Sequence, residues 1–479
     1  MTDQYNFDAE ICDIVGSERY LQDPDDMRGY LESWGGRYHG QARGVVLPKS
    51  TSEVADIMYL CRRLRIAIVP QSGNTGLVGG AVPMDGEGAI VLNLSRMNRI
   101  RAVDPINDTV TAEAGVILHA LQTELANRDR CFPINLGSAG SCQIGGLIAT
   151  NAGGTGAIRH GVMRDQILGL EVVLPDGQIF HGLRGLHKDN SGYDLKHLFI
   201  GAEGTLGIVT AAVLRLSAVP VQSITAMVSF SSLDAALRLL QKLRGGLGTR
   251  IESFELMSRR QLEIVLQHSD DSTSPVDPDG ADWFGMIEIA DTMADAKLSD
   301  GLVAILADML ESGDLRDATL ANSLAQSQRI WRLRHSISEA NRKIGFTVSH
   351  DTSVPISATA SFLPRVEAAL HAACPGVIVA SCGHIGDGNV HVACVFPKDQ
   401  FGGQDTEQLA WDMARIVQLE SLACGGSIAA EHGIGRAHVV RLADSKDPTA
   451  YGLMRAIKAC IDPYNIMNPG VMFTQRKDL

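Results

Sequence analysis

The spacing of hydrophobic residues near the start of the chain predicts a strand, a helix and a second strand in succession. Apolar residues recur at helical spacing over 54–64, after serine and threonine residues at 50–52 that suit a helix N-cap. The short apolar runs at 44–48 and 67–69 predict the flanking strands.

A different pattern begins after Pro220 and predicts a second α+β domain. An apolar run at 224–230 predicts a strand, and amphipathic spacing over 233–243 predicts a helix. The stretch 269–282 is rich in Asp, Ser and Pro and predicts an exposed loop before another strand at 283–289. This alternation is typical of a domain built on an antiparallel sheet.

Further elements follow from similar local patterns. Two short apolar runs, 170–174 and 178–180, are separated by Pro-Asp-Gly and predict a β-hairpin. Residues 328–340 have helical spacing, and 346–355 and 390–396 predict strands. The fold class expected from all these elements is α+β.

Composition indicates a globular protein and argues against two classes of partner. The 479 residues carry a formal charge of -13, which argues against nucleic acid or an anionic membrane surface as the main partner. No apolar run reaches the length of a membrane span. The start of the chain is acidic, and the nine cysteines form no Cys-x-x-Cys pair. We therefore expect a cytoplasmic protein without an iron–sulfur or cysteine–zinc site.

Two histidines and a carboxylate have the residue types of a metal site. His384 and His391 flank a Gly-Asp-Gly turn, and Glu431 is followed directly by His432. Two imidazoles and one carboxylate leave an open position on a divalent cation, as a catalytic metal requires. His432 is then a candidate general base. Histidines beside glycines are also common in ordinary loops, so the pattern alone leaves both interpretations open.

Three glycine-rich segments, at 70–80, 137–154 and 199–209, predict close approach of the backbone to an elongated ligand. Such a ligand would place a pyrophosphate at one loop and a flat ring system against the others. The chain has neither the Gly-x-Gly-x-x-Gly fingerprint after a first strand nor a Walker lysine. Each segment taken alone is also compatible with a surface turn.

The same segments resemble the FAD-binding domain of the vanillyl-alcohol-oxidase superfamily. The motifs are Pro-Gln-Ser-Gly-Asn-Thr-Gly-Leu at 70–77, Ile-Gly-Gly-Leu-Ile-Ala-Thr-Asn-Ala-Gly-Gly at 144–154 and Gly-Ala-Glu-Gly-Thr-Leu-Gly-Ile-Val-Thr at 201–210. Their order and spacing match over about 45–213. The resemblance implies FAD, bound without a covalent link because the first loop has no histidine. The FAD contacts it implies are Pro70, Gln71, Ser72, Gly73, Asn74, Thr75, Gly76, Leu77, Ser141, Gly146, Asn151, Gly154, Gly204, Ile208 and Asn468.

Motifs in the second half narrow the resemblance to FAD-dependent D-2-hydroxyacid dehydrogenases. Three motifs carry this similarity: Trp-Arg-Leu-Arg-His-Ser-Ile-Ser-Glu-Ala at 331–340, Gly-His-Ile-Gly-Asp-Gly-Asn-Val-His at 383–391 and Ala-Glu-His-Gly-Ile-Gly at 430–435. They are most similar to the motifs of D-2-hydroxyglutarate dehydrogenases, and second to those of D-lactate dehydrogenases. The resemblance implies an FAD-binding domain at 1–219, a substrate-binding domain at 220–425 and a C-terminal segment at 426–479 that returns to the FAD domain.

The resemblance also implies roles for individual residues. His384, His391 and Glu431 would hold a divalent metal, Zn²⁺ first and Mn²⁺ or Co²⁺ as alternatives. His432 would take the hydroxyl proton, and Arg334 would bind the substrate carboxylate with its planar fork.

The substrate positions depart from the pattern of the enzymes that act on D-2-hydroxyglutarate. Those enzymes carry a lysine where this chain has Ser349 and an asparagine where it has Ala393, while Ser338 replaces a threonine. The expected substrate-binding set is Arg334, Ser338, Ser349, Ala393 and His432. A lost charged contact weakens a preference for a diacid, so we expect an (R)-2-hydroxy acid that is either D-2-hydroxyglutarate or a D-lactate-like or larger monocarboxylic acid.

The expected electron acceptor is an electron-transfer flavoprotein or a quinone, and a homodimer is compatible with the sequence. Two alternative functions remain open at this point. A flavin oxidase of the same superfamily would need no metal, and a metal-dependent hydrolase would follow if the glycine loops were only structural. A non-catalytic binding module fits least well.

Overall fold

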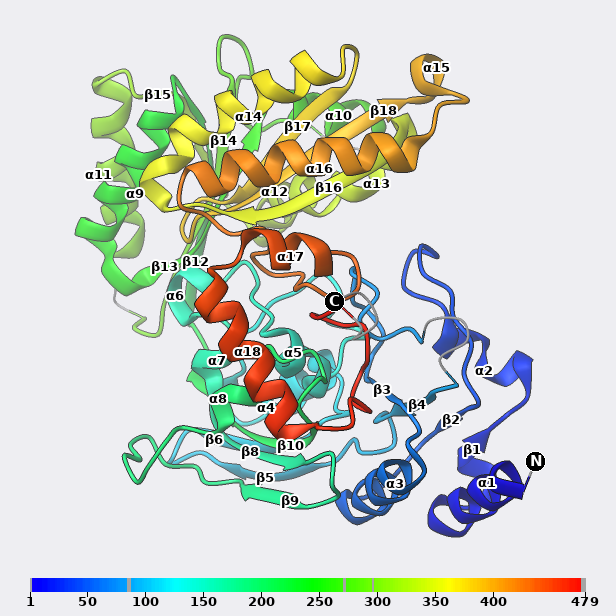
Figure 1. Cartoon of the computed structure of the whole chain (residues 1–479). Helices are drawn as coiled ribbons and strands as arrows, with labels where there is room; N and C mark the ends of the chain where they lie inside the picture. The colour runs from blue at the N-terminus through cyan, green and yellow to red at the C-terminus, as the bar shows by residue number, and fades with distance from the viewer. Residues whose placement is uncertain (1, 84–87, 270–272, 295–296, 475–479) are drawn as a thin grey trace. The chain divides into compact units, whose positions relative to one another are not determined.

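The computed structural model describes residues 2–83, 88–269, 273–294 and 297–474. Its chain divides into two compact units (Figure 1). Unit 1 comprises Met1–Gly153, Gly161–Val219 and Glu431–Leu479, and unit 2 comprises Gly154–His160 and Pro220–Ala430. None of the helices in the described ranges is both long and apolar enough to cross a membrane.

The first sheet of unit 1 contains the strand–helix–strand pattern expected from the sequence. Its order is β1 (Tyr20–Leu21), β2 (Gly44–Val46), β4 (Ile90–Asn93) and β3 (Ile68–Gln71), with β2, β4 and β3 parallel. Helix α3 (Thr51–Leu64) begins at the Ser50 cap, whose side chain accepts a hydrogen bond from the Glu53 amide. The residues that define its helical spacing are buried, and the helix ends at Arg65 in the left-handed conformation.

The second sheet of unit 1 is antiparallel and includes the expected hairpin. Its order is β5 (Ile100–Asp104), β6 (Thr109–Glu113), β10 (Ile208–Arg215), β8 (Ile167–Val173) and β9 (Ile179–Gly182). Strands β8 and β9 pair across the Pro-Asp-Gly turn, where Gly177 has φ 85°. Helix α5 (Ile144–Thr150) forms within the second glycine-rich segment and packs beside β10.

The last part of the chain attaches to the first sheet of unit 1. The Ile68 amide donates to the carbonyl of Ile466, and the Asn468 amide donates to the carbonyl of Ile68, both at 2.8 Å. Before this contact, helix α18 (Pro448–Ile461) carries Lys458, whose Nζ donates to Asp462 Oδ2 at 2.6 Å and to the carbonyls of Thr205 and Met467 at 2.8 Å. This buried ion pair therefore fixes the turn that leads to Asn468.

Unit 2 is built on a seven-stranded sheet in which every pair of neighbours is antiparallel, as the sequence predicts. The order is β15 (Leu315–Leu320), β12 (Gln222–Phe230), β14 (Trp283–Asp291), β13 (Ile251–Ser258), β17 (Ile378–His384), β18 (Asn389–Pro397) and β16 (Gly345–Ser353). Apolar residues on both faces are buried, because helices cover both faces.

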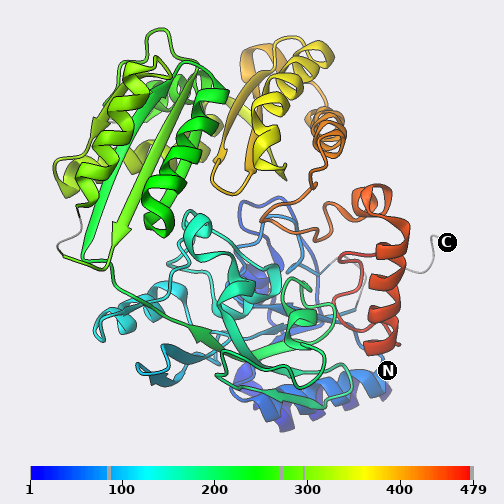
Figure 2. The ribbon, with the colours of Figure 1, turned by 90° about the vertical axis from the view of Figure 1, so that its left-hand side faces the viewer.

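Two groups of helices form these covering layers. Figure 2 shows helices on both sides of the strands. One core cluster packs four helices against the first face: α9 (Leu233–Leu247), α11 (Leu298–Glu311), α14 (Thr359–Ala373) and α16 (Thr406–Ala423). A second cluster packs three helices against the other face: α10 (Arg259–His268), α12 (Leu324–His335) and α13 (Ile337–Ile344).

Two expectations differ from the structure. The helix expected over 328–340 is two helices, α12 and α13, separated at Ser336, whose amide still donates to the carbonyl of Arg332. The stretch 269–282 is not simply exposed: residues 270–272 lie outside the described ranges, and Val276 and Ala281 are buried in the second core cluster. Burial of these two apolar side chains places this part of the otherwise polar loop against the core.

The Lys458–Asp462 pair provides a test of how the C-terminal segment is held. Lys458→Met should reduce the free energy of unfolding by about 3–5 kcal/mol, because it removes the only cation paired with the buried Asp462 among the described residues and leaves that carboxylate with two backbone amides. The exposed Lys446 supplies the control Lys446→Met. Urea unfolding of the FAD-loaded protein, followed by circular dichroism, measures both. Equal midpoints for the two variants would contradict the role given to Lys458.

Candidate active site

Unit 1 contains a cavity of about 300 Å³ whose wall is formed by the three glycine-rich segments. The lining residues named in advance as FAD contacts are Pro70, Gln71, Ser72, Gly73, Asn74, Thr75, Gly76, Leu77, Gly146, Gly204 and Ile208. The structure thus brings together, within one unit, segments that lie far apart in the sequence.

Four other residues expected to contact FAD are not among the lining residues: Ser141, Asn151, Gly154 and Asn468. Asn151 ends helix α5 with φ 51°, and its Oδ1 accepts from the Arg164 amide at 2.9 Å. Asn468 is 2% exposed, and its Nδ2 donates to the carbonyls of Gly80 and Glu203. Both asparagines therefore shape the wall from behind, and their direct contact with FAD stays a prediction.

The first loop presents its backbone amides in a way that suits phosphate oxygens. In the part of the chain that the structure describes, none of the amides of residues 72–77 donates a hydrogen bond to another residue. Side chains hold the loop instead: Gln71 Nε2 donates to Tyr30 and Ala81 carbonyls, and Asn74 Nδ2 donates to the Glu32 carbonyl. Consecutive amides without an internal acceptor are available to donate to an anion such as a phosphate.

Two further observations fit a ligand that fills this cavity. Gln143 lines it, and its buried Oε1 has no hydrogen-bond partner among the described residues. A buried polar atom of this kind normally has a partner, so a bound group is expected to supply one. At Gly73 a Cβ would lie 2.3 Å from the Ser141 carbonyl oxygen, so only glycine allows the first two segments to approach each other so closely.

Two carboxylates and one imidazole line the same cavity: Glu203, Glu431 and His432. Glu431 and His432 were expected at the site, but Glu203 was not. Burial raises the pKa of Glu203 to about 7, although two backbone amides that donate to its carboxylate oppose the shift. The only advance sign of Glu203 was a carboxylate inside a glycine-rich segment.

In unit 2, the sheet places the two expected histidines on one face. His384 ends β17 and His391 lies near the start of β18, with the Gly-Asp-Gly turn between them. The register pairs His384 with Asn389, and His391 with Cys382. Side chains alternate between the faces of a sheet, so His384 and His391 share a face. Their ring centroids are 5.5 Å apart.

Glu255 on the neighbouring strand β13 joins this site, although the sequence analysis did not identify it. It pairs with His384 in the sheet and is 0% exposed. One carboxylate oxygen contacts His384 Nδ1, and the other accepts from Arg334 Nε at 2.7 Å. Burial raises the pKa of Glu255, but the charges of His384 and Arg334 outweigh it and lower the pKa to about 2.

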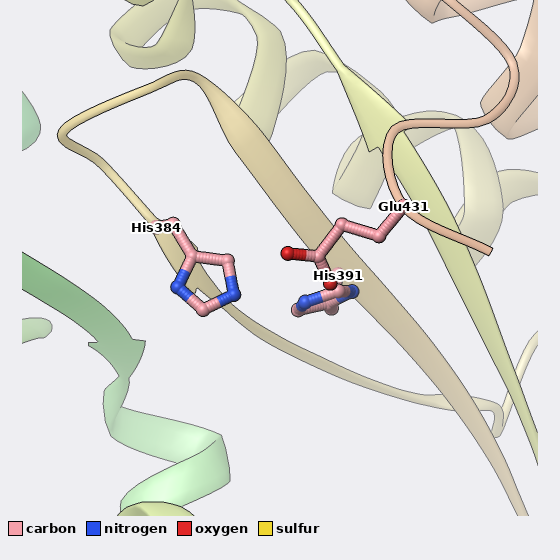
Figure 3. Close-up of side chains that lie close together, drawn as sticks. All are labelled: His384, His391 and Glu431. Carbon is pink, nitrogen blue, oxygen red and sulfur yellow. The ribbon is translucent and has the colours of Figure 1, made fainter. Parts of the chain in front are cut away.

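Glu431 brings a carboxylate to the two imidazoles. Ligand atoms of His384, His391 and Glu431 all lie within 4.8 Å of one another, and Figure 3 shows the three side chains pointing toward a common space. Glu431 directly follows Ala430, whose amide donates to Asp351 Oδ2 on β16 at 3.0 Å. A histidine ligand usually has its other ring nitrogen held by a carboxylate, as Glu255 holds His384. The donor set therefore fits a divalent cation.

The residues expected to bind the rest of the substrate also lie on or near this face. Ser349 of β16 pairs directly with Ala393 of β18, and Asp351 pairs with His391, so all four share the face of the metal group. Ser349 is exposed, while Ala393 is 4% exposed and packs in the apolar cluster beneath α12 and α13. Ser338 is exposed on α13. Neither Ser349 nor Ala393 can supply a positive charge.

Comparison with protein families gives two matches that together span most of the chain. The FAD binding domain family matches residues 42–182, and the family described as FAD linked oxidases, C-terminal domain, matches residues 219–472. These matches confirm the FAD-binding domain expected from the glycine-rich motifs.

Curated relatives are similar over nearly the whole length. A probable mitochondrial D-2-hydroxyglutarate dehydrogenase of Oryza sativa subsp. japonica is 36% identical over 460 residues, covering 95% of this chain and 79% of the relative. The D-2-hydroxyglutarate dehydrogenase of Xanthomonas citri pv. viticola is 35% identical, with 96% and 95% covered. A D-2-hydroxyglutarate–pyruvate transhydrogenase of Saccharomyces cerevisiae is 35% identical, with 95% and 92% covered.

Solved structures confirm the expected fold. Alkyldihydroxyacetonephosphate synthase superposes with a TM-score of 0.73 at 18% identity, covering 97% of this chain and 84% of that one. p-Cresol methylhydroxylase superposes with a TM-score of 0.72 at 16% identity, covering 100% and 99%. At these identities the likeness establishes the α+β architecture and carries no information on substrate.

The cavity predicts how the flavin is attached. The first loop has no histidine, and burial raises the pKa of Cys142, which lines the cavity, so that this cysteine stays an unreactive thiol. Acid precipitation of the loaded protein should therefore leave all the flavin absorbance in the supernatant. A yellow pellet would contradict this prediction, and Cys142→Ser would then show whether that thiol carries the flavin.

Proposed function

The chain belongs to the family of FAD-linked oxidases, in its branch of FAD-dependent D-2-hydroxyacid dehydrogenases. We propose that it oxidises an (R)-2-hydroxy acid to the 2-oxo acid with the help of a divalent metal. One observation supports this proposal above the others: Glu431 lines the FAD cavity together with His432 and also belongs to the group formed with His384 and His391.

The residues proposed to hold the two cofactors are those described above. The loop 70–77 would bind FAD, and His384, His391 and Glu431 would bind Zn²⁺, with Mn²⁺ or Co²⁺ as alternatives. When bound, FAD accepts the hydrogen and electron pair from C2 of the substrate, and the cation lowers the pKa of the hydroxyl group.

The protein's own side chains would perform the remaining steps. His432 would take the hydroxyl proton, since an imidazole is a suitable base near neutral pH. Arg334 would bind the C1 carboxylate through its guanidinium. Glu255 would keep Arg334 and His384 in place by contacting both, so that the carboxylate and the hydroxyl of one substrate meet their partners together.

The identity of the substrate has two candidates. The names of the relatives make D-2-hydroxyglutarate the first. The pairing of Ser349 with Ala393 favours the second, a D-lactate-like or larger monocarboxylic acid, because these neutral side chains occupy the positions beyond His391 on the same face. A distal carboxylate placed there would need a cation from elsewhere to offset its desolvation.

Other properties stay predictions. An electron-transfer flavoprotein or a quinone is proposed as the acceptor, a homodimer as the assembly and the cytoplasm as the location, although several relatives are named mitochondrial. A flavin oxidase that needs no metal is the alternative function. It differs in reducing oxygen and in retaining its activity after metal removal.

Metal removal tests the proposed centre. Dialysis against a chelator should abolish turnover while leaving the flavin absorbance unchanged, and Zn²⁺, Mn²⁺ or Co²⁺ should restore turnover.

Glu255→Gln should weaken metal binding by roughly 10- to 100-fold, because it weakens the contact that orients the proposed ligand His384. The matched control is Glu288→Gln, which alters a half-buried glutamate of the next strand that accepts from Ser223. Competition with a fluorescent chelator measures both affinities; equal affinities, or activity that resists the chelator, would refute the metal role.

Anaerobic bleaching of the flavin by D- and L-2-hydroxy acids tests the reaction and the substrate. Bleaching by D but not L isomers is expected.

Ser349→Lys should raise kcat/KM for D-2-hydroxyglutarate relative to D-lactate by about 10- to 150-fold, which is the contribution of one charge-assisted contact. Ser349→Met, which matches the length of lysine without its charge, should not. A wild-type enzyme that already prefers D-2-hydroxyglutarate strongly would show that another cation replaces the lysine.

A further inference from the structure

Glu203 is the one buried carboxylate on the wall of the FAD cavity for which the chemistry above has no use. Its backbone is fixed from two sides: its amide donates to the Ala149 carbonyl at 2.8 Å, and its carbonyl accepts from Asn468 Nδ2 at 2.8 Å. The residue has φ 51° and is 9% exposed. A charged side chain is rarely held so deeply unless it has a specific task.

The carboxylate binds two consecutive backbone amides from a distant part of unit 1. Oε1 accepts from the Ile434 amide at 2.8 Å, and Oε2 accepts from the Gly435 amide at 2.7 Å. An ionised acceptor makes such hydrogen bonds roughly twice as strong as neutral ones. The segment that it holds begins with Glu431 and His432, which line the same cavity.

Two glycines of this segment, Gly433 and Gly435, lie too close to their neighbours to be replaced by a residue with a side chain unless those neighbours move. A Cβ at Gly433 would lie 2.8 Å from Glu203 Oε1, and a Cβ at Gly435 would lie 2.2 Å from the Val78 carbonyl oxygen. The same Val78 carbonyl accepts from the Arg436 and Ala437 amides at 2.9 and 3.2 Å. The segment 433–437 is thus clamped between Glu203 and the end of the first FAD loop.

We propose that Glu203 is a positioning residue, which docks the segment 431–437 on the wall of the FAD cavity and so sets where Glu431 and His432 lie. Both functions of that pair, metal ligation and proton removal, then depend on a carboxylate that touches neither the metal nor the substrate. The catalytic part of this inference rests on the proposed function, whereas the docking does not.

The ionisation of Glu203 is coupled to the docking. Burial raises its pKa to about 7, and the amides of Ile434 and Gly435 lower it. Because the amides favour the ionised form, loss of the docked segment would favour the protonated one. In the described chain, the shift has no contribution from a charged side chain, so these amides are what stabilises the buried charge.

Glu203→Gln tests the inference in the FAD-loaded protein. Glutamine offers one acceptor oxygen and one NH₂ donor, so one of the two amides keeps its partner and the other faces a donor. Hydrogen exchange of peptides that cover 431–437 should become about 10- to 150-fold faster, which is the loss of one hydrogen bond to a charged group. The flavin content should match the wild type, and kcat should fall while KM changes little.

The matched control is Glu113→Gln, which alters a fully buried glutamate of β6 that accepts from the Arg99 amide in the same unit. It should leave exchange in 431–437 unchanged. Gly433→Ala is a second variant that keeps Glu203 and should loosen the same segment, since its Cβ would displace the carboxylate.

Several results would overturn the proposal. These are wild-type exchange rates in Glu203→Gln, faster exchange with unchanged kcat, or loss of flavin from Glu203→Gln, which would make Glu203 a cofactor contact. If the wild-type protein oxidises no 2-hydroxy acid, the proposed function fails, while the exchange comparison still tests the docking.

Discussion

The proposed chemistry depends on the carboxylate of Glu255, which contacts both His384, a proposed metal ligand, and Arg334. It is fully buried, so its charge is tolerated only because His384 and Arg334 both contact it. The converse also holds, since the His384 ring and the Arg334 guanidinium are each oriented by the oxygen that they contact. An arginine on α12 and a histidine on β17 therefore act as one unit, although 50 residues of sequence separate 334 from 384.

Unit 1 solves a different problem, that of binding a large anionic ligand with few charged side chains. Residues 70–77 line the cavity, and among the described residues the amides of 72–77 have no hydrogen-bond acceptor. The side-chain amides of Gln71 and Asn74 hold the loop in place. Backbone donors of this kind are oriented before the ligand arrives, so binding requires little rearrangement. The glycine at 73 is required because the second segment approaches it so closely.

The sequence predicted those parts of the structure that local spacing or ordered motifs determine. Helix α3 follows from its cap and apolar spacing, the 170–180 hairpin from its Pro-Asp-Gly turn, and the FAD-binding domain from three motifs in order. The break between α12 and α13 could not be predicted, because Ile330, Leu333, Ile337 and Ala340 keep the spacing of one continuous helix.

The residues that the sequence analysis missed are those whose importance arises from tertiary pairing. Glu255 lies in an apolar strand and Glu203 in a glycine loop, and neither belongs to a metal or acid–base motif by spacing. The two carboxylates within this strand, Glu252 and Glu255, were the available sign, because burial of an unpaired charge is costly. Which partners offset that cost depends on strand order, and the order β13-β17-β18 is not contained in any local pattern.

The two missed glutamates also show why residue type alone does not determine charge. Glu255 contacts Arg334 and His384, which lower its pKa to about 2, whereas the Glu203 carboxylate accepts from two backbone amides and burial raises its pKa to about 7. Glu255 therefore carries a fixed charge that orients His384 and Arg334. The pKa of Glu203 lies near neutrality, because the amides of Ile434 and Gly435 oppose the effect of burial. The sheet of unit 2 therefore holds one carboxylate as a fixed charge, whereas in unit 1 the ionisation of the other carboxylate depends on the two amides that donate to it.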